Sequence, residues 1–82
     1  MYYIVYGITD CPSCLIAQAK LMDRDKEYVF VNTDFSKTYR NDIREKLNWP
    51  TFPIIVMVQD QNNTLIGGAD ELSVHLGKQL GA

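Results

Sequence analysis

Apolar residues fall into short runs along the chain, and polar or turn-forming residues separate them. Runs rich in β-branched and aromatic side chains occupy Tyr2 to Ile8, Tyr28 to Val31 and Ile54 to Val58. Continuous apolar runs of this length are typical of strands buried on both faces. The polar stretch Asp60-Gln61-Asn62-Asn63 then predicts a hairpin turn, and Thr64 to Gly67 predicts a fourth strand after it.

Helical spacing appears between these runs. Three apolar stripes recur at i and i+4, followed by i+7 or i+8: Leu15, Ala19 and Met22; Tyr39, Ile43 and Leu47; Leu72, Leu76 and Leu80. Each stripe would place one side of a helix on a sheet. The order β-α-β-α-β-β-α predicts an α/β fold in which helices flank a four-stranded mixed sheet. Because no linker or repeat divides the chain, we expect residues 1–82 to form a single domain.

Charge and terminal composition exclude several classes of partner. Eight Lys and Arg stand against ten Asp and Glu, and neither sign forms a long run, which argues against nucleic-acid binding. The N-terminus lacks a basic region and a small-residue cleavage site, and no apolar run approaches the roughly 18 residues that cross a bilayer. We therefore expect a soluble, unexported protein that is cytoplasmic and monomeric and has no membrane partner.

The candidate chemistry lies in Cys11-Pro12-Ser13-Cys14, where the first apolar run gives way to the first helical pattern. A bridge between these cysteines would close a very short loop and constrain little chain entropy. In reducing compartments such a pair is more often redox-active or metal-binding than structural. A structural zinc needs four ligands, and His75 is the only histidine, so no metal is expected. The plain alternative is two small buried apolar residues.

The position of Pro12 suggests different roles for the two cysteines. Proline is favoured at the first position of a helix, which makes Cys11 the N-cap. The free N–H groups and the dipole of a helix start stabilise a thiolate and lower its pKa. Asp10 opposes this effect with an adjacent carboxylate, so we expect a moderate lowering of the Cys11 pKa. Cys14 lies one turn on, with its sulfur turned inward. We predict that Cys11 attacks disulfides and that Cys14 resolves the product.

Three landmarks, in this order and spacing, resemble the glutaredoxin family of the thioredoxin-like superfamily: Cys11-Pro12-Ser13-Cys14, Thr51-Phe52-Pro53 and Gly67 to Leu72. The resemblance covers nearly the whole chain. It implies a thioredoxin-like fold and a dithiol oxidoreductase that uses glutathione to reduce protein disulfides or glutathione mixed disulfides. Ribonucleotide reductase is a protein substrate that the family makes plausible. The short chain, Tyr6-Gly7 ahead of the motif and the absence of the family's lysine three residues before Cys11 resemble the compact glutaredoxins of tailed phages more than typical cellular ones.

The resemblance also implies a glutathione site. In the family, the segment matching Thr51-Phe52-Pro53 contacts the cysteinyl part of glutathione, the proline follows a cis peptide bond, and that proline lies beside the redox motif. The segment matching Gly68-Ala69-Asp70 receives the γ-glutamyl end. A helix N-terminus suits a carboxylate, and Asp70 is also expected to cap the last helix.

The chain departs from the family pattern at two positions. Ile8 stands where many glutaredoxins carry a lysine for the glycine carboxylate of glutathione, so Arg40 or Arg44 would have to supply that charge. Ser13 replaces a common tyrosine and leaves the thiols more open. The missing lysine suggests a redoxin recharged by a thioredoxin reductase as an alternative.

Two other functional classes remain open. The first is an iron–sulfur carrier that holds a cluster through Cys11 of two subunits, which the stiff Pro12 disfavours. The second is a non-catalytic binding module. Trp49-Pro50 is interpreted either as an exposed docking surface or, more simply, as packing over a helix end, and His75 as structural or as a surface residue.

Overall fold

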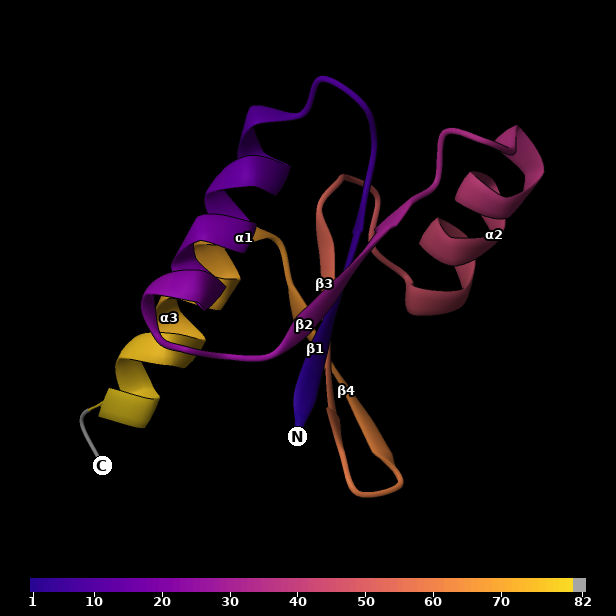
Figure 1. Ribbon diagram of the computed structural model, residues 1–82. Helices are drawn as coiled ribbons and strands as arrows, with labels where there is room; N and C mark the ends of the chain where they lie inside the picture. The colour runs from indigo at the N-terminus through magenta and orange to yellow at the C-terminus, as the bar shows by residue number, and fades with distance from the viewer. Residues whose placement is uncertain (81–82) are drawn as a thin grey trace.

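The computed structural model describes residues 1–80, with side chains to Lys78, and confirms the predicted β-α-β-α-β-β-α order (Figure 1). The elements are β1 (Tyr2–Gly7), α1 (Pro12–Asp23), β2 (Tyr28–Asn32), α2 (Lys37–Leu47), β3 (Ile54–Gln59), β4 (Asn62–Gly67) and α3 (Ala69–Leu80). The hairpin turn is shorter than expected, because β3 and β4 pair up to Gln59 and Asn62 and leave Asp60-Gln61 as the turn.

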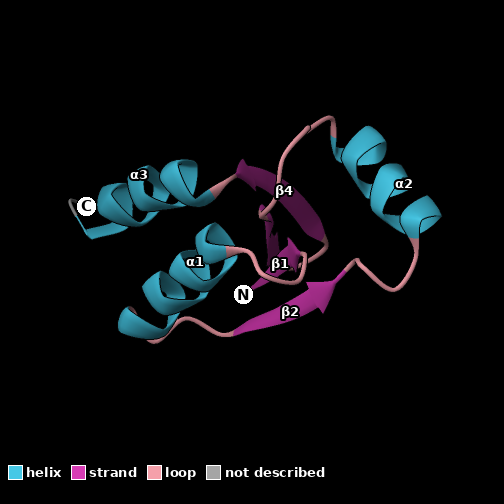
Figure 2. Ribbon diagram, turned by 90° about the horizontal axis from the view of Figure 1, so that it is seen from above, coloured by secondary structure: helices cyan, strands magenta, loops and turns pink. Residues whose placement is uncertain are grey.

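The four strands form one mixed sheet in the order β2-β1-β3-β4. β1 pairs with β2 in parallel and with β3 antiparallel, and β3 continues into the antiparallel hairpin with β4. Helices α1 and α3 lie on one face of this sheet and α2 lies on the other (Figures 1 and 2). None of the helices within residues 1–80 has the length and apolar character needed to cross a bilayer.

The core lies between the sheet and the α1–α3 layer. Side chains from both sheet and helices meet there without solvent exposure or nearly so: Tyr3, Val5, Ala17, Leu21, Ile55, Leu72 and Leu76. The predicted stripe on α3 is therefore confirmed at Leu72 and Leu76, while the side chain of Leu80 lies outside the described residues.

The predicted apolar stripe on α1 is wrong. Leu15 is 67% exposed and Met22 58%, whereas the buried residues of the helix are Cys14, Ala17 and Leu21. Both sets have helical spacing, and α1 carries apolar residues on most of its circumference. The buried side is the one on which Cys14 turns inward from the N-cap, and Ala17 and Leu21 follow it one and two turns later.

The expectation that the first three strands are buried on both faces is also wrong. β1 alternates between buried and partly exposed residues, and in β2 Val29 is 50% exposed. Only the start of β3, Ile54 to Val56, is buried on both sides. Helix α2 covers only part of the sheet face on which it lies, and an apolar groove of about 430 Å³ remains along β1 and β2.

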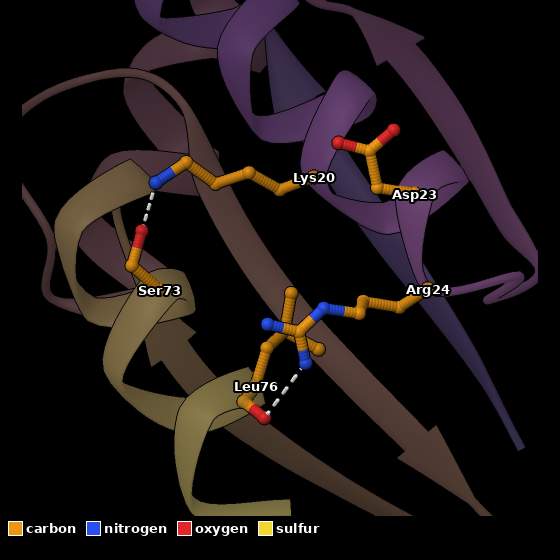
Figure 3. A pocket seen from close by; sticks show the side chains of 5 residues that line it. All are labelled: Lys20, Asp23, Arg24, Ser73 and Leu76. Carbon is orange, nitrogen blue, oxygen red and sulfur yellow. Dashed lines mark hydrogen bonds between the residues drawn. The ribbon is translucent and has the colours of Figure 1, made fainter. Parts of the chain in front are cut away.

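Polar contacts join α1 to α3 beside a small surface cavity (Figure 3). The Lys20 ammonium donates to Ser73 Oγ, and the Arg24 guanidinium donates to the Leu76 carbonyl at 3.2 Å. Deeper in the layer, Tyr3 Oη lies 2.9 Å from His75 Nε2. These contacts fix α3 against both α1 and β1, which determines where the first turn of α3 lies.

Candidate redox site and adjoining cleft

Cys11 and Cys14 form a disulfide at the start of α1, with their Cα atoms 5.2 Å apart. Cys11 is the N-cap in extended conformation, and Pro12 occupies the first turn, as predicted. The Cys14 backbone N–H donates to Cys11 Sγ at 3.1 Å. Because the same N–H would face a thiolate on Cys11 after reduction, the helix start provides a donor for the anion.

The two sulfurs differ in their access to solvent. Cys14 is 2% exposed, whereas Cys11 is partly exposed and the intervening Pro12 and Ser13 are exposed. A substrate can therefore approach the Cys11 sulfur from solvent, whereas the surrounding protein shields the Cys14 sulfur. This asymmetry suits an outer nucleophile and an inner resolving thiol.

Gly7, at the end of β1, makes room for the inner sulfur. A Cβ at this position would lie 2.9 Å from Cys14 Sγ and 2.5 Å from the Phe30 ring. Both distances are shorter than van der Waals contact allows, so only glycine fits here without movement of its neighbours. Sequence reasoning missed this role of Gly7 and Phe30. A glycine that ends an apolar strand run is the available signal, since it often marks a close approach.

The loop that leads from β1 to Cys11 is held by the loop after β2. Thr33 is fully buried and donates to the Gly7 carbonyl through its N–H at 2.8 Å and its Oγ1 at 3.0 Å. Asp34 accepts from the Thr9 N–H at 2.7 Å and pairs with Arg40 at 3.1 Å. The hydrogen bond from Thr9, followed by the Arg40 contact, lowers the pKa of Asp34. These contacts hold the loop that leads from β1 to Cys11 in place.

A cleft of about 190 Å³ adjoins the redox motif, and the predicted glutathione-binding segments line it together. Its walls come from the α1 start, the segment before β3 and the first turn of α3: Ser13, Trp49, Thr51, Phe52, Pro53, Gly68, Ala69, Asp70 and Glu71. The Phe52–Pro53 peptide bond is cis, as expected. The N-termini of α1 and α3 thus border the same cleft.

The first turn of α3 differs from the expectation in one respect. The helix begins at Ala69, so Asp70 lies in its first turn and Gly68 is the residue before it. Glu71 Oε1 accepts from the Gly68 N–H at 2.9 Å. A glycine at the N-cap has no side chain to offer, and the glutamate three residues later supplies the reciprocal half of a capping box. The prediction that Asp70 caps the helix was wrong for this reason.

Trp49 is one of the residues that line the cleft, a position that the sequence analysis did not assign to it. Asn48, in the left-handed conformation, caps the C-terminus of α2, and the backbone N–H of Trp49 donates to the Arg44 carbonyl at 3.0 Å. The indole then packs on the glycine pair before α3, because a Cβ on Gly67 would lie 3.0 Å from its Cη2 atom. Gly67 has a φ of 121°. The tryptophan therefore joins the end of α2 to the start of α3, as the packing interpretation predicted.

The two arginines considered as replacements for the missing lysine lie in different places. Arg40 is engaged with Asp34 on the loop behind the motif. The Arg44 guanidinium lies 5.8 Å from the centre of the Phe52 ring and donates to Asn41. Since Phe52 lines the cleft, Arg44 is the arginine placed against one of its walls.

Comparisons with known proteins agree with the geometry. A family model described as Glutaredoxin matches residues 2–61, which include both cysteines and Thr51-Phe52-Pro53. Among solved structures, reduced Escherichia coli glutaredoxin matches with a TM-score of 0.74, 27% identity and full coverage of both chains.

Two further structures have a similar fold. A Brucella melitensis glutaredoxin matches with a TM-score of 0.76, 24% identity and coverage of 95% of this chain and 80% of that one. A wheat glutaredoxin matches with a TM-score of 0.71 and 18% identity, and the match covers 94% of this chain and 69% of that one. No curated protein sequence matches this chain at a significant level. The likenesses confirm the predicted thioredoxin-like fold.

Proposed function

The chain belongs to the glutaredoxin family of thiol–disulfide oxidoreductases, and on that premise we propose that it uses glutathione to reduce protein disulfides and glutathione mixed disulfides. One observation carries the proposal. The accessible Cys11 lies at a helix start, and both segments that the family uses for glutathione line the cleft next to it. Residues 1–82 would act as one cytoplasmic, monomeric domain, and ribonucleotide reductase is one protein substrate to test. The likeness to phage glutaredoxins stays a prediction.

The proposed reaction begins at the reduced Cys11. Its thiolate attacks the glutathione sulfur of a mixed disulfide, a new S–S bond forms to Cys11, and the protein thiolate leaves and takes a proton. A second glutathione thiolate then attacks the glutathione on Cys11, which releases oxidised glutathione and restores the Cys11 thiolate. For a protein disulfide, Cys14 attacks the Cys11 mixed disulfide instead and gives the Cys11–Cys14 bridge. Two glutathione molecules then reduce that bridge.

The cleft has features that fit glutathione. Gly68 lines the cleft without a side chain of its own, and a Cβ there would approach Glu71 Oε1 to 3.1 Å. Backbone N–H groups at the start of α3 suit the γ-glutamyl carboxylate. At the other end, Arg44 over Phe52 is the cation that we assign to the glycine carboxylate in place of the lysine replaced by Ile8.

The experiment compares two reducing systems. We expect turnover of a glutathionylated peptide with glutathione, glutathione reductase and NADPH, measured as loss of NADPH absorbance. Cys11→Ser should abolish it. Cys14→Ser should keep this activity but lose reduction of a protein disulfide such as that of insulin. Asp60→Asn, in the distant β3–β4 turn, is the control for a surface charge change.

The absence of the lysine favours one alternative. A redoxin recharged by thioredoxin reductase needs no glutathione carboxylate contact, and Ile8 is consistent with that. Activity only with thioredoxin reductase and NADPH would establish the alternative and defeat the glutathione proposal. Full activity of Cys11→Ser in both systems would defeat the assignment of the nucleophile.

A further inference from the structure

The indole N–H of Trp49 is buried and has no hydrogen-bond partner among the described residues. A buried donor without an acceptor carries a desolvation penalty, and native structures keep few of them. An indole N–H can only donate. Trp49, which lines the cleft, therefore offers one unused donor.

The place of this donor indicates what it can reach. A Cβ on Gly68 would lie 3.8 Å from Trp49 Nε1, 3.7 Å from the Pro53 carbonyl oxygen and 3.1 Å from Glu71 Oε1. The nitrogen therefore lies next to Gly68, at the start of α3. The Glu71 oxygen nearby already accepts from the Gly68 N–H at 2.9 Å. No described residue accepts from the indole, and Trp49 lines the cleft, so a molecule bound there supplies an acceptor once it displaces the side chains that cover the nitrogen.

We propose that Trp49 Nε1–H donates a hydrogen bond to the α-carboxylate of the γ-glutamyl residue of glutathione. This inference rests on the proposed use of glutathione. Among the groups at that end of the ligand, the carboxylate is the acceptor, because the ammonium has no lone pair. Asp70 and Glu71 supply carboxylates that suit the ammonium instead. A hydrogen bond to a charged group is stronger than one between neutral groups.

The first test follows the indole directly. Trp49 is the only tryptophan of the chain, so a ¹⁵N–¹H spectrum contains one indole cross-peak. S-methylglutathione, whose blocked sulfur cannot exchange disulfides, is titrated into the oxidised full chain. We expect the indole proton to move downfield, with the same dissociation constant as the backbone amides of Gly68 and Ala69.

The second test removes only the donor. Trp49→Phe keeps an aromatic ring against Gly67 and should weaken S-methylglutathione binding about tenfold, the effect of losing a hydrogen bond to a charged group. A second ligand carries γ-aminobutyryl in place of γ-glutamyl and so lacks the α-carboxylate. The wild type and Trp49→Phe should bind this second ligand equally.

The outcomes separate the two proposals. If the indole cross-peak stays fixed while the Gly68 amide titrates, or if Trp49→Phe loses affinity equally for both ligands, the role of Trp49 is wrong and glutathione use stands. If the wild type binds neither ligand, both proposals fail. Thermal unfolding of Trp49→Phe shows whether a loss of affinity comes from a damaged fold, and the wild-type cross-peak decides the question independently of that variant.

Discussion

Asp10 is the residue whose charge most directly opposes the proposed chemistry, because its carboxylate immediately precedes the Cys11 thiol. Its φ of 54° lies in the left-handed region, which Asp and Asn tolerate better than most residues. Asp10→Asn therefore keeps the backbone and removes the charge. We expect the pKa of the Cys11 thiol to fall, because a nearby anion no longer disfavours the thiolate.

Alkylation of the reduced protein by iodoacetamide measures this change. Below the thiol pKa, Asp10→Asn should react about threefold faster than the wild type, as expected for loss of one partly screened charge. Asp60→Asn is the matched control, since Asp60 also has a positive φ, 56°, but lies in the β3–β4 turn. Equal rates for all three proteins would show that the Asp10 carboxylate does not act on the sulfur.

Gly7 is the residue at which shape, rather than charge, limits the site. We expect Gly7→Ala to cost about 1–3 kcal/mol of unfolding free energy in urea, because the new methyl group would overlap Cys14 Sγ and the Phe30 ring. Gly77→Ala is the control, since a Cβ there meets no atom within 4 Å. Within α3 that change should stabilise by about 0.5–1 kcal/mol. Similar effects of the two substitutions would contradict the packing argument.

At the scale of the element, α1 shows which side of a helix supports the fold. Leu21 is fully buried and Met22, the next residue, is 58% exposed. Leu21→Ala should cost about 2–5 kcal/mol, the range for a buried leucine that leaves a cavity. Met22→Ala should stay within about 0.5 kcal/mol. Urea unfolding of both variants checks this, and the reverse order would restore the stripe of Leu15, Ala19 and Met22 as the buried face.

The sequence predicts the order of the elements better than the faces they bury. Apolar runs and helical spacing indicate every strand and helix, because each depends on neighbours along the chain. On α1, however, several apolar stripes satisfy the same spacing. For β2, the exposure of Val29 depends on how much of the sheet α2 covers. Such choices are made by contacts between distant segments, which local patterns do not contain.

Some features of the candidate site could likewise be predicted from the sequence, and others depend on contacts between distant segments. The N-cap position of Cys11 follows from its proline neighbour, and the family resemblance placed Thr51-Phe52-Pro53 beside Gly68-Ala69-Asp70. The start of α3 was harder to predict, because a capping side chain and a glycine N-cap with Glu71 are both compatible with that segment. The contact of Trp49 with Gly67 joins the end of one helix to the start of another, and no local signal announces it.

In the whole molecule, α1 and α3 lie side by side on one face of the sheet (Figure 2). The first residues of both helices line the same cleft. The Tyr3–His75 pair belongs to this arrangement, since it joins the central strand β1 to α3 at 2.9 Å. Partial burial, followed by the charges of Lys26 and Lys78, lowers the pKa of His75 from its ordinary value of 6.5. The neutral ring is therefore the form that the fold favours.

This shift predicts how stability depends on pH. As the pH falls below about 7, the unfolded chain protonates its histidine first, near the ordinary pKa of 6.5, while the folded chain does so only at lower pH. The contribution of His75 is therefore complete above that range and decreases as the pH falls through 6.5 to the folded pKa. Asp34, whose pKa is lowered from 3.8, acts in a separate and more acidic window.

Urea unfolding at pH 7.5 and 5.5 tests the prediction. The midpoint of the wild type should fall over this interval by more than that of His75→Gln, which can still hydrogen-bond Tyr3 but cannot take up a proton. His75 is the only histidine, so its ring proton signal reports the folded pKa in the same samples without overlap. A pH dependence that His75→Gln leaves unchanged, or a folded pKa at or above 6.5, would show that the partial burial of His75 beside Tyr3 does not favour the neutral ring. The acid sensitivity of the α3 attachment would then have to come from other groups.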